Sequence, residues 1–304
     1  MTHLWQPDQT IEPFLALELI QEQFPLLNAN QIRLLGAGWD NTAFVINEEI
    51  IFRFPRRKIA LPLLETETEL LPKLKKQLPL PIPFPEWIGK ASSKFPYPFI
   101  GYRMLPGVTA CYANLKEDER AKLAIPIAHF LSTLHAVSPQ VMGNWEIKQD
   151  NLSRINGHLL IPRLQKNLDE LSLLNLLKNR KQIELAIEQA SSHFREPKAT
   201  SLVHGDFYIR HMLVDEKHNL CGIIDWGDIH VGDPAIDLSI MFSFLPLKAH
   251  DQFIKTYGLI SQETLSLAKV RAIFSSTYLL LFGHHTNDPD LVREGSFSLE
   301  QICR

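Results

Sequence analysis

Short runs of apolar residues near the start of the chain predict a small β-sheet. Between residues 31 and 54, the segments IRLLGAG, TAFVI and IIFRF are separated by a glycine-containing loop and by the turn Asn47-Glu48-Glu49. Connections this short join antiparallel neighbours. The segment ETETELLPKLKKQL follows, with straight-chain helix formers, leucines at helical spacing and a proline cluster behind it. It predicts one helix after the sheet.

The pattern changes to a helical period after the apolar and aromatic segment PYPFIGYRMLPG. Residues 117 to 137 carry apolar side chains at three- and four-residue spacing and predict an amphipathic helix, which Pro126 should bend or restart. These elements predict an α+β fold, with a small N-terminal antiparallel β lobe containing one helix and a larger, mainly helical C-terminal lobe. Further elements predicted in that lobe are helices over residues 168 to 190 and most of 235 to 303, and short strands around Leu202 and Gly222.

The segment PYPFIGYRMLPG, which ends in a Pro-Gly turn, is the predicted linker between the two lobes. We place the hinge at about residues 98 to 107, which gives an N-terminal lobe of residues 1–105 and a C-terminal lobe of residues 106–304. With 304 residues and 45% hydrophobic content, the chain is long enough to bury a core in each lobe.

Composition and charge indicate which kinds of binding partner and which cellular compartment to expect. The chain has 31 Lys and Arg against 34 Asp and Glu, and its net charge of -3 argues against binding nucleic acid by phosphate neutralisation. The cysteines Cys111, Cys221 and Cys303 form no CxxC pair, which argues against a disulfide framework or a zinc site. The N-terminus lacks a signal-like pattern, and no uninterrupted apolar run reaches the roughly 18 residues of a spanning helix. We therefore expect a cytoplasmic protein without nucleic-acid, membrane or obligate protein partners.

Candidate chemistry is concentrated in residues 202 to 240, LVHGDFYIRHMLVDEKHNLCGIIDWGDIHVGDPAIDLSI. Asp206 and Asp225 each follow a short apolar run, in LVHGD and GIIDWGD. A carboxylate at the end of a buried strand is held at the edge of a cleft, where it can accept a proton or bind a hard cation. Phosphoryl transfer requires a carboxylate near the attacking hydroxyl, oxygen ligands for magnesium, and positive groups on the phosphates. The two aspartates can supply the first two requirements.

This segment resembles the catalytic segment of the aminoglycoside phosphotransferase and choline kinase-like family, whose members have a bilobal protein-kinase-like fold. The residues His204-Gly205-Asp206 match the start of the family pattern HGDxxxxN, and Asp225-Trp226-Gly227-Asp228 stands in the place of the kinase DFG element. The resemblance implies that Asp206 is the catalytic base and Asp225 a magnesium ligand. Where the pattern has Asn, this chain has His211. Imidazole is a poorer magnesium ligand than an amide oxygen, so His211 implies a metal bound differently, tolerance of manganese, or an impaired site.

A weaker resemblance in the N-terminal half implies the nucleotide-binding residues. Gly36, Gly38 and Asn41 belong to the turn LGAGWDN, which would cover the phosphates because glycines let backbone amides approach an anion. Arg53 stands where the family has a Lys that contacts the phosphates, and Glu67 suits the acid that pairs with it. Arginine can bind phosphate through two hydrogen bonds, but it is not equivalent to lysine.

The resemblance also implies the remaining ligands. The linker strand around Tyr102 and Met104 should offer backbone hydrogen bonds to the base of the nucleotide. The phosphoryl donor would be ATP or GTP with Mg²⁺, or with Mn²⁺ as the alternative, and the acceptor would be a small hydroxylated molecule. The segment from His230 to Arg304 contains eight Asp and Glu against six Lys and Arg, which is only weak support for a polycationic acceptor.

Several of these residues have structural interpretations beside the functional ones. Asp233 can cap the helix that begins at Pro234, and we predict a structural role for it and for Asp237. Asp228 either supports the site or lies in a solvated turn. His204 is expected to pack and hydrogen-bond behind the catalytic loop.

The nucleotide-binding assignment has competitors as well. Arg53 could be an ordinary surface residue of a strand, and Glu65 and Glu69 compete with Glu67 for the same role.

Three functions remain open at this point. The first is a small-molecule kinase in which Asp206 activates the acceptor hydroxyl. The second is a nucleotide-binding pseudokinase that senses or scaffolds, motivated by His211 and Arg53. The third is a metal-dependent phosphohydrolase that uses the aspartates alone and would not need Gly36 and Gly38.

Overall fold

The computed structural model describes residues 7–38, 40–138 and 154–303. The chain divides into two compact units, each described by itself. Unit 1 contains Met1–Gln77 and Pro81–Leu105, and unit 2 contains Leu78–Leu80 and Pro106–Arg304.

Unit 1 is built on a five-stranded antiparallel sheet with the strand order β1-β2-β3-β5-β4. Its aromatic core follows from the alternation in the strands: Phe44, Phe52, Phe54 and Phe99 are fully buried, and the rings of Phe54 and Phe99 stack with centroids 4.4 Å apart. The elements are α1 (Pro13–Gln23), η1 (Pro25–Leu27), β1 (Ile32–Ala37), β2 (Asn41–Ile46), β3 (Ile50–Pro55), η2 (Lys58–Ala60), α2 (Leu61–Leu74), β4 (Trp87–Gly89) and β5 (Phe99–Arg103).

Helix α1 was not predicted from the sequence. Its segment LALEL places leucines at every second position, which is the period of a strand. In the structure Ala16, Leu19 and Ile20 are buried and join the aromatic core of unit 1. Tertiary packing, rather than local pattern, therefore determines this helix.

Unit 2 is mainly helical and contains two small sheets, in which β7 pairs with β10 and β8 lies between β6 and β9. The kinase-like α+β class predicted from the sequence is confirmed. The elements of unit 2 are β6 (Val108–Thr109), η3 (Ala110–Tyr112), α3 (Glu117–Lys122), α4 (Ala124–His135), α5 (Gly157–Leu173), α6 (Arg180–Ser191), β7 (Ser201–Val203), η5 (Ile209–His211), β8 (Met212–Val214), β9 (Leu220–Ile223), β10 (His230–Gly232), α7 (Ala235–Leu238), α8 (Ile240–Ser243), η6 (Leu247–Ala249), α9 (His250–Tyr257), α10 (Gln262–His285) and α11 (Pro289–Ile302).

Two of the predicted helices are divided in the structure. The helix expected over residues 117 to 137 is interrupted at Leu123, and Pro126 lies in the first turn of the second part, α4, where proline is tolerated. The helix expected over residues 168 to 190 is two helices, because α5 ends at Leu173 and Asn175 adopts a left-handed conformation with φ 56°.

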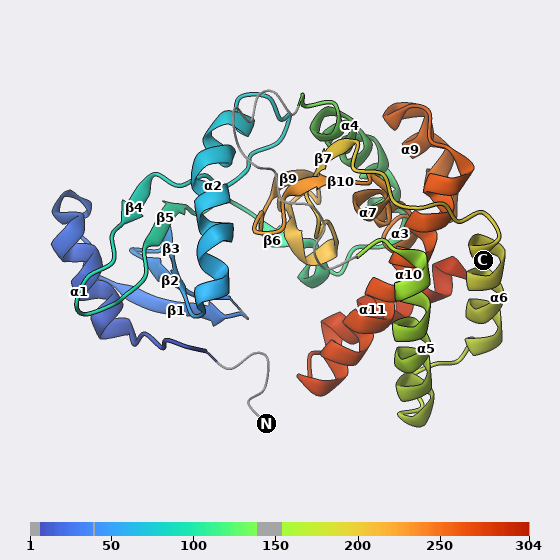
Figure 1. The fold of residues 1–304 in the computed structure, drawn as a ribbon, viewed down its shortest axis with the longest axis horizontal. Coiled ribbons are helices and arrows are strands. Elements are labelled where there is room, and N and C mark those ends of the chain that lie inside the picture. Colours follow the sequence, from blue (N-terminus) through green and yellow to red (C-terminus); the bar gives the residue numbers. More distant parts are fainter. Residues whose placement is uncertain (1–6, 39, 139–153, 304) are drawn as a thin grey trace. The chain divides into compact units, whose positions relative to one another are not determined.

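Helix α10 is the centre of unit 2 and packs against α5, α6, α7, α8 and α11 (Figure 1). By length and composition it could span a membrane, but 67% of its most apolar window is buried inside the protein. Apolar residues all round a helix are typical of a buried core helix. Helix α10 therefore contributes to the core of unit 2.

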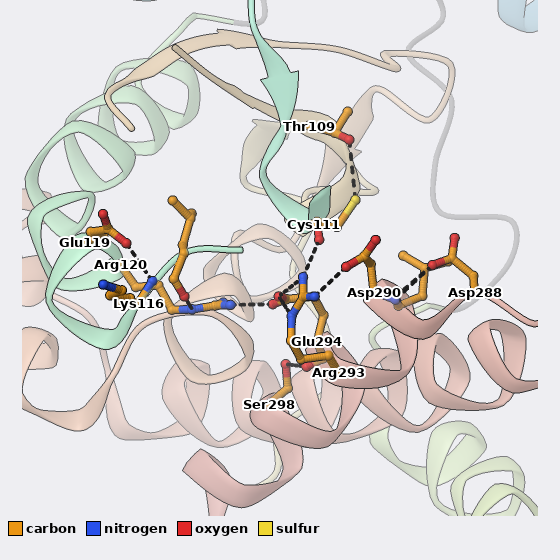
Figure 2. Close-up of polar contacts among 12 residues, drawn as sticks. Thr109, Cys111, Lys116, Glu119, Arg120, Asp288, Asp290, Arg293, Glu294 and Ser298 are labelled. Carbon is orange, nitrogen blue, oxygen red and sulfur yellow. Dashed lines mark hydrogen bonds and ion pairs between the residues drawn. The ribbon is translucent and has the colours of Figure 1, made fainter. Parts of the chain in front are cut away.

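A buried ion cluster ties α3, η3 and α11 together in unit 2 (Figure 2). The guanidinium of Arg120 donates to Glu294 Oε2 at 2.6 Å, and the two side chains are 3% and 1% exposed. Arg293 donates to Glu294 Oε1 at 3.2 Å and to the backbone oxygen of Cys111 at 3.0 Å. Burial lowers the pKa of Arg120 more than the neighbouring Glu294 raises it.

Candidate active site

Asp206 lies in the loop that follows strand β7, at the end of the segment His204-Gly205-Asp206. Gly205 has φ +84°, and a Cβ atom at this position would lie 2.2 Å from the backbone oxygen of Asp228. Only glycine fits such a turn without strain. The turn leaves the Asp206 carboxylate 34% exposed, so it can reach a ligand from solvent.

Asp237 holds this loop through hydrogen bonds to its backbone. Its fully buried carboxylate accepts hydrogen bonds from the backbone N–H groups of His204 at 2.7 Å and Gly205 at 3.0 Å, and it lies 3.1 Å from His135 Nε2. Burial raises the pKa of Asp237, but the contacts of its carboxylate, that with the His135 side chain first and the backbone N–H of His204 among the others, outweigh burial, and the net pKa is lowered. The structural role predicted for Asp237 is therefore a specific one, since it fixes the backbone next to Asp206.

His204 connects the loop of Asp206 to the strand that carries Asp225. Its Nε2–H donates to the backbone oxygen of Ile224 at 3.0 Å, and its Nδ1 accepts from the backbone N–H of Asp206 at 3.3 Å. Its ring packs on Trp226 with centroids 4.7 Å apart. Burial lowers the pKa of His204 despite the nearby Asp237, which favours this neutral tautomer. The packing role predicted for His204 is therefore borne out by these contacts.

Asp225 and Asp206 are joined by His211. The Nε2 atom of His211 lies 3.2 Å from Asp225 Oδ2, and its Nδ1 donates to the backbone oxygen of Asp206 at 2.8 Å and lies 3.7 Å from Asp206 Oδ2. Asp225 has φ +62°, an uncommon conformation for a residue other than glycine, and its side chain is 52% exposed. Burial lowers the pKa of His211, but the two carboxylates prevail and raise it to about 9.

The donor atoms around Asp225 fit a magnesium ion only in part. Magnesium prefers oxygen ligands and is commonly bound by one or two carboxylates together with substrate phosphates, which the exposed Asp225 could provide. Both ring nitrogens of His211 face oxygens, Nδ1 the backbone oxygen of Asp206 and Nε2 the Asp225 carboxylate, so in this arrangement neither nitrogen is directed at a metal. Among the described residues no group of three or more His, Cys, Asp or Glu side chains is arranged to hold a metal. Metal binding by Asp225 and His211 stays a prediction.

Asp228 and Asp233 stabilise the surroundings of the loop. Arg154 donates to Asp228 Oδ1 at 2.6 Å and to the backbone oxygen of Gly205 at 3.4 Å. Asp233 accepts from the backbone N–H of Ala235 at 3.0 Å, at the start of α7, and pairs with Arg195 at 2.5 Å. The predicted capping role of Asp233 is confirmed.

In unit 1, Arg53 and Glu67 form a nearly buried ion pair. Arg53 Nη1 lies 2.8 Å from Glu67 Oε2, with the side chains 14% and 3% exposed. Glu65 and Glu69, the competing acids, are exposed on α2. The pair joins strand β3 to helix α2, and its role in nucleotide binding stays a prediction.

The glycine turn and the linker strand are also in unit 1. Gly36 lies at an irregularity in the pairing of β1 with β2, and the backbone N–H of Gly38 donates to Asn41 O at 2.9 Å; Trp39 of this turn is outside the described residues. Tyr102 pairs with Ile51 across the β3–β5 ladder. The backbone N–H of Met104 donates to Glu49 O at 2.7 Å, so in this structure it is engaged within the protein. Contacts of these residues with nucleotide stay predictions.

One functional candidate was missed in the sequence. Arg271 of α10 places its Nη2 3.9 Å from Asp206 Oδ1, the oxygen that does not face His211. The signal was present as a single arginine in the apolar stretch KVRAIFSSTYLLLF, because a buried helix accommodates a charge only where it meets an opposite one.

Comparisons with known proteins indicate the family of the chain. The family model "Phosphotransferase enzyme family" matches residues 31–270. The GDP and kanamycin complex of APH(2")-IIIa has 27% sequence identity and a TM-score of 0.66, covering 94% of this chain and 97% of that one. The GDP complex of wild-type aminoglycoside 2'-phosphotransferase-IIIa has 25% identity and a TM-score of 0.67, covering 96% and 99%.

Two further matches are more limited. Macrolide 2'-phosphotransferase type I shares the fold, with a TM-score of 0.58 at 18% identity, covering 95% of this chain and 98% of that one. The uncharacterized protein YcbJ of Bacillus subtilis (strain 168) is 31% identical over 61 residues, which is 20% of each chain. This chain therefore matches only about a fifth of that curated relative.

Proposed function

Because the chain belongs to the phosphotransferase enzyme family, we propose that it transfers the γ-phosphoryl group of ATP or GTP to a hydroxyl group of a small molecule. The observation that carries the proposal is the supported position of Asp206. His204 accepts from its backbone N–H and Asp237 holds the two residues before it, while its carboxylate remains partly exposed and is linked to Asp225 through His211. A base must be held in place and yet be within reach of the acceptor proton.

In the proposed reaction, the acceptor hydroxyl oxygen attacks the γ-phosphorus and forms a new O–P bond. The bond between the γ-phosphorus and the bridging oxygen breaks, and the nucleoside diphosphate leaves with that oxygen. The hydroxyl proton passes to the Asp206 carboxylate. Magnesium, held by Asp225 and the nucleotide phosphates, would neutralise charge on the phosphates.

On the nucleotide side, the Arg53 guanidinium, positioned by Glu67, would bind phosphate oxygens, and the turn from Gly36 to Asn41 would cover them. The similar structures named above contain GDP, and another, at 22% identity, contains ADP, so both ATP and GTP are candidate donors.

The test is Asp206→Asn beside the matched control Asp215→Asn. Asp215 belongs to the same segment but accepts hydrogen bonds from Lys217 and Asn219 in a turn. With ATP or GTP, Mg²⁺ and a competent acceptor, Asp206→Asn should lower kcat about 10²- to 10⁴-fold, the usual contribution of a general base. The control should retain most of the wild-type rate. Equal rates in the two variants would refute the proposed role of Asp206.

A nucleotide sensor with little transfer activity is the second candidate, and the contact of His211 with Asp225 favours it. Since His211 occupies Asp225 Oδ2 at 3.2 Å and so competes with a metal for that carboxylate, the wild-type protein would bind nucleotide without efficient transfer. His211→Asn restores the family residue and its amide oxygen. If the chain is a sensor for this reason, the wild type should show little transfer and His211→Asn should create metal-dependent transfer. If the chain is a kinase, the wild type should already transfer phosphate.

A further inference from the structure

The carboxylate of Asp237 is the last member of a longer series of side-chain contacts behind the loop of residues 204–206. Its two oxygens accept from the first two backbone N–H groups of this loop, at 2.7 and 3.0 Å. Its Oδ2 also lies 3.1 Å from His135 Nε2, and His135 Nδ1 lies 2.8 Å from the hydroxyl oxygen of Tyr257. A phenol, an imidazole and a carboxylate therefore lead, in this order, to the backbone of the loop.

Three helices bring these side chains together. His135 is the last residue of α4, Tyr257 is the last residue of α9, and Asp237 belongs to α7. Helix α9 packs against α4 (Figure 1). The ring of Tyr257 meets that of His135 edge to face, with centroids 5.7 Å apart, and is parallel to the ring of Phe253. The side chains of His135 and Asp237 are 5% and 0% exposed, so packing holds the three groups in one arrangement.

The hydrogen bonds of this series have a fixed direction. Although burial raises the pKa of Asp237, its contacts lower it on balance, so the carboxylate is ionised at neutral pH and can only accept. His135 must therefore carry hydrogen on Nε2, and in the neutral ring Nδ1 is then the acceptor. Burial and the charge of Asp237 raise the pKa of Tyr257, so its hydroxyl keeps the proton that it donates to Nδ1.

The hydroxyl of Tyr257 thereby selects the tautomer that Asp237 requires. Without a donor at Nδ1, the imidazole of His135 can carry its hydrogen there instead, and a bare Nε2 would then face the ionised carboxylate at 3.1 Å. Two groups that only accept repel each other, and Asp237 would turn away from the ring. Gly205 depends on this anchor, because its φ is +84° and glycine adopts many other conformations readily.

We infer that Tyr257 and His135 are positioning residues for Asp206, because together they orient the carboxylate that holds the backbone before it. Both act on Asp206 only through Asp237. The effect on the rate rests on the proposed function, in which Asp206 is the base, whereas the effect on the loop does not. A shift of a catalytic group by about 1 Å is enough to lower a rate about 100-fold.

The amides glutamine and asparagine at position 135 separate the hydrogen bond from the mere presence of a polar side chain. The amide nitrogen of Gln can take the place of imidazole Nε2, whereas that of Asn, one methylene shorter, reaches only the place of Nδ1. His135→Gln should therefore keep a donor to Asp237, and His135→Asn should lose it. His129→Asn, at an exposed position of the same helix, is the matched control.

Tyr257→Phe removes only the hydroxyl and keeps the ring that packs on Phe253. Tyr112→Phe is the matched control, because it removes the same atom from an exposed tyrosine whose hydroxyl donates to Asp288 at 3.0 Å.

The first measurement is hydrogen exchange of the backbone amides of His204 and Gly205 in the full chain, which requires no transfer activity. Tyr257→Phe should speed this exchange about 2- to 10-fold, as expected for loss of a neutral hydrogen bond. His135→Asn should speed it about 10- to 100-fold, because the lost bond has a charged acceptor. His135→Gln should recover most of the protection, and the two controls should match the wild type. Exchange in the core helix α10 should not change.

The second measurement is the rate of transfer with ATP or GTP, Mg²⁺ and a competent acceptor. In Tyr257→Phe and His135→Asn, kcat should fall by factors similar to those for exchange, while the KM for nucleotide stays within about twofold, since only the position of the base changes. His135→Gln should restore kcat together with the protection of the loop.

Three results would overturn the inference. They are wild-type exchange at His204 and Gly205 in both Tyr257→Phe and His135→Asn, an equal loss in His135→Gln and His135→Asn, or exchange that is faster to the same extent in α10. The last two would leave these side chains with a packing role alone. If the exchange changes as expected but the wild type transfers no phosphate, this inference stands and the proposed function fails.

Discussion

The buried contact of Arg120 with Glu294 allows a quantitative prediction for Glu294→Gln. This substitution keeps the shape of the side chain but removes the negative charge that compensates a guanidinium 3% exposed. Arg120 retains the backbone oxygen of Leu115 at 3.1 Å, while its Nη1 has no hydrogen-bond partner among the described residues. A buried carboxyl or amine can escape by changing its protonation, but an arginine remains charged in proteins.

The expected cost is about 3–5 kcal/mol, the typical loss when one partner of a buried ion pair is removed. The charge-assisted hydrogen bond at 2.6 Å accounts for about 1.5–3 kcal/mol of it, and desolvation of the unpaired charge accounts for the rest. A domain of this size loses about 2–4 °C in Tm per kcal/mol. We therefore expect the transition of unit 2 to fall by roughly 10 °C.

The measurement is urea unfolding followed by circular dichroism, combined with hydrogen exchange of the amides in α11. Glu300→Gln, an exposed position on the same helix, is the matched control and should change the free energy of unfolding by less than about 0.5 kcal/mol. The double substitution Arg120→Leu and Glu294→Leu should recover much of the loss, because an apolar pair needs no compensation. A Glu294→Gln loss no larger than that of Glu300→Gln, with an unchanged slope against urea, would refute the reasoning.

Three further predictions concern the loop and the nucleotide. Gly205→Ala should cost about 1–3 kcal/mol and greatly reduce transfer, because φ +84° and a Cβ 2.2 Å from a carbonyl oxygen force the loop to move; urea unfolding and a rate assay measure both effects. The pKa of Asp237 is lowered below its ordinary value of 3.8, so its contribution to stability is complete above that pH and is lost as the pH falls through the native pKa. We therefore expect Asp237→Asn to be less stable than the wild type at pH 7 and less sensitive to acid between pH 4 and pH 2, as measured by the Tm against pH. Arg53→Met should raise the KM for nucleotide about 10-fold or more, whereas Arg33→Met, which removes an exposed pair of the same sheet, should leave it unchanged.

The sequence was sufficient to predict the α+β architecture, because it depends on local patterns, and it pointed to Asp206 and Asp225, which in the structure both contact His211. Strands alternate, helices repeat at 3.6 residues, and the motif places its aspartates directly after short strands. The same local reasoning predicted that Asp233 caps a helix, and the structure confirms it.

The supports of the site could not be predicted in the same way, since they join distant positions. Asp237 bonds to the backbone of His204, 33 residues earlier, and lies against His135, 102 residues earlier. Arg271 reaches Asp206 from a helix whose sequence indicates only an apolar core. Such contacts depend on the packing of α4, α7 and α10 around the loop, which no local periodicity determines.

His211 shares the support of the Asp206 loop with two other side chains. His204 fixes the backbone of Asp206 relative to Ile224, and Asp237 fixes the backbone on the other side of Gly205. His211 contributes to the same support, because its Nδ1 donates to the backbone oxygen of Asp206 at 2.8 Å. A substitution there changes the ligands available near Asp225, while one at Arg271 changes the surface facing the other oxygen of Asp206. Because His211 contacts both Asp206 and Asp225, we expect a substitution at 211 to affect metal binding and the position of the base together.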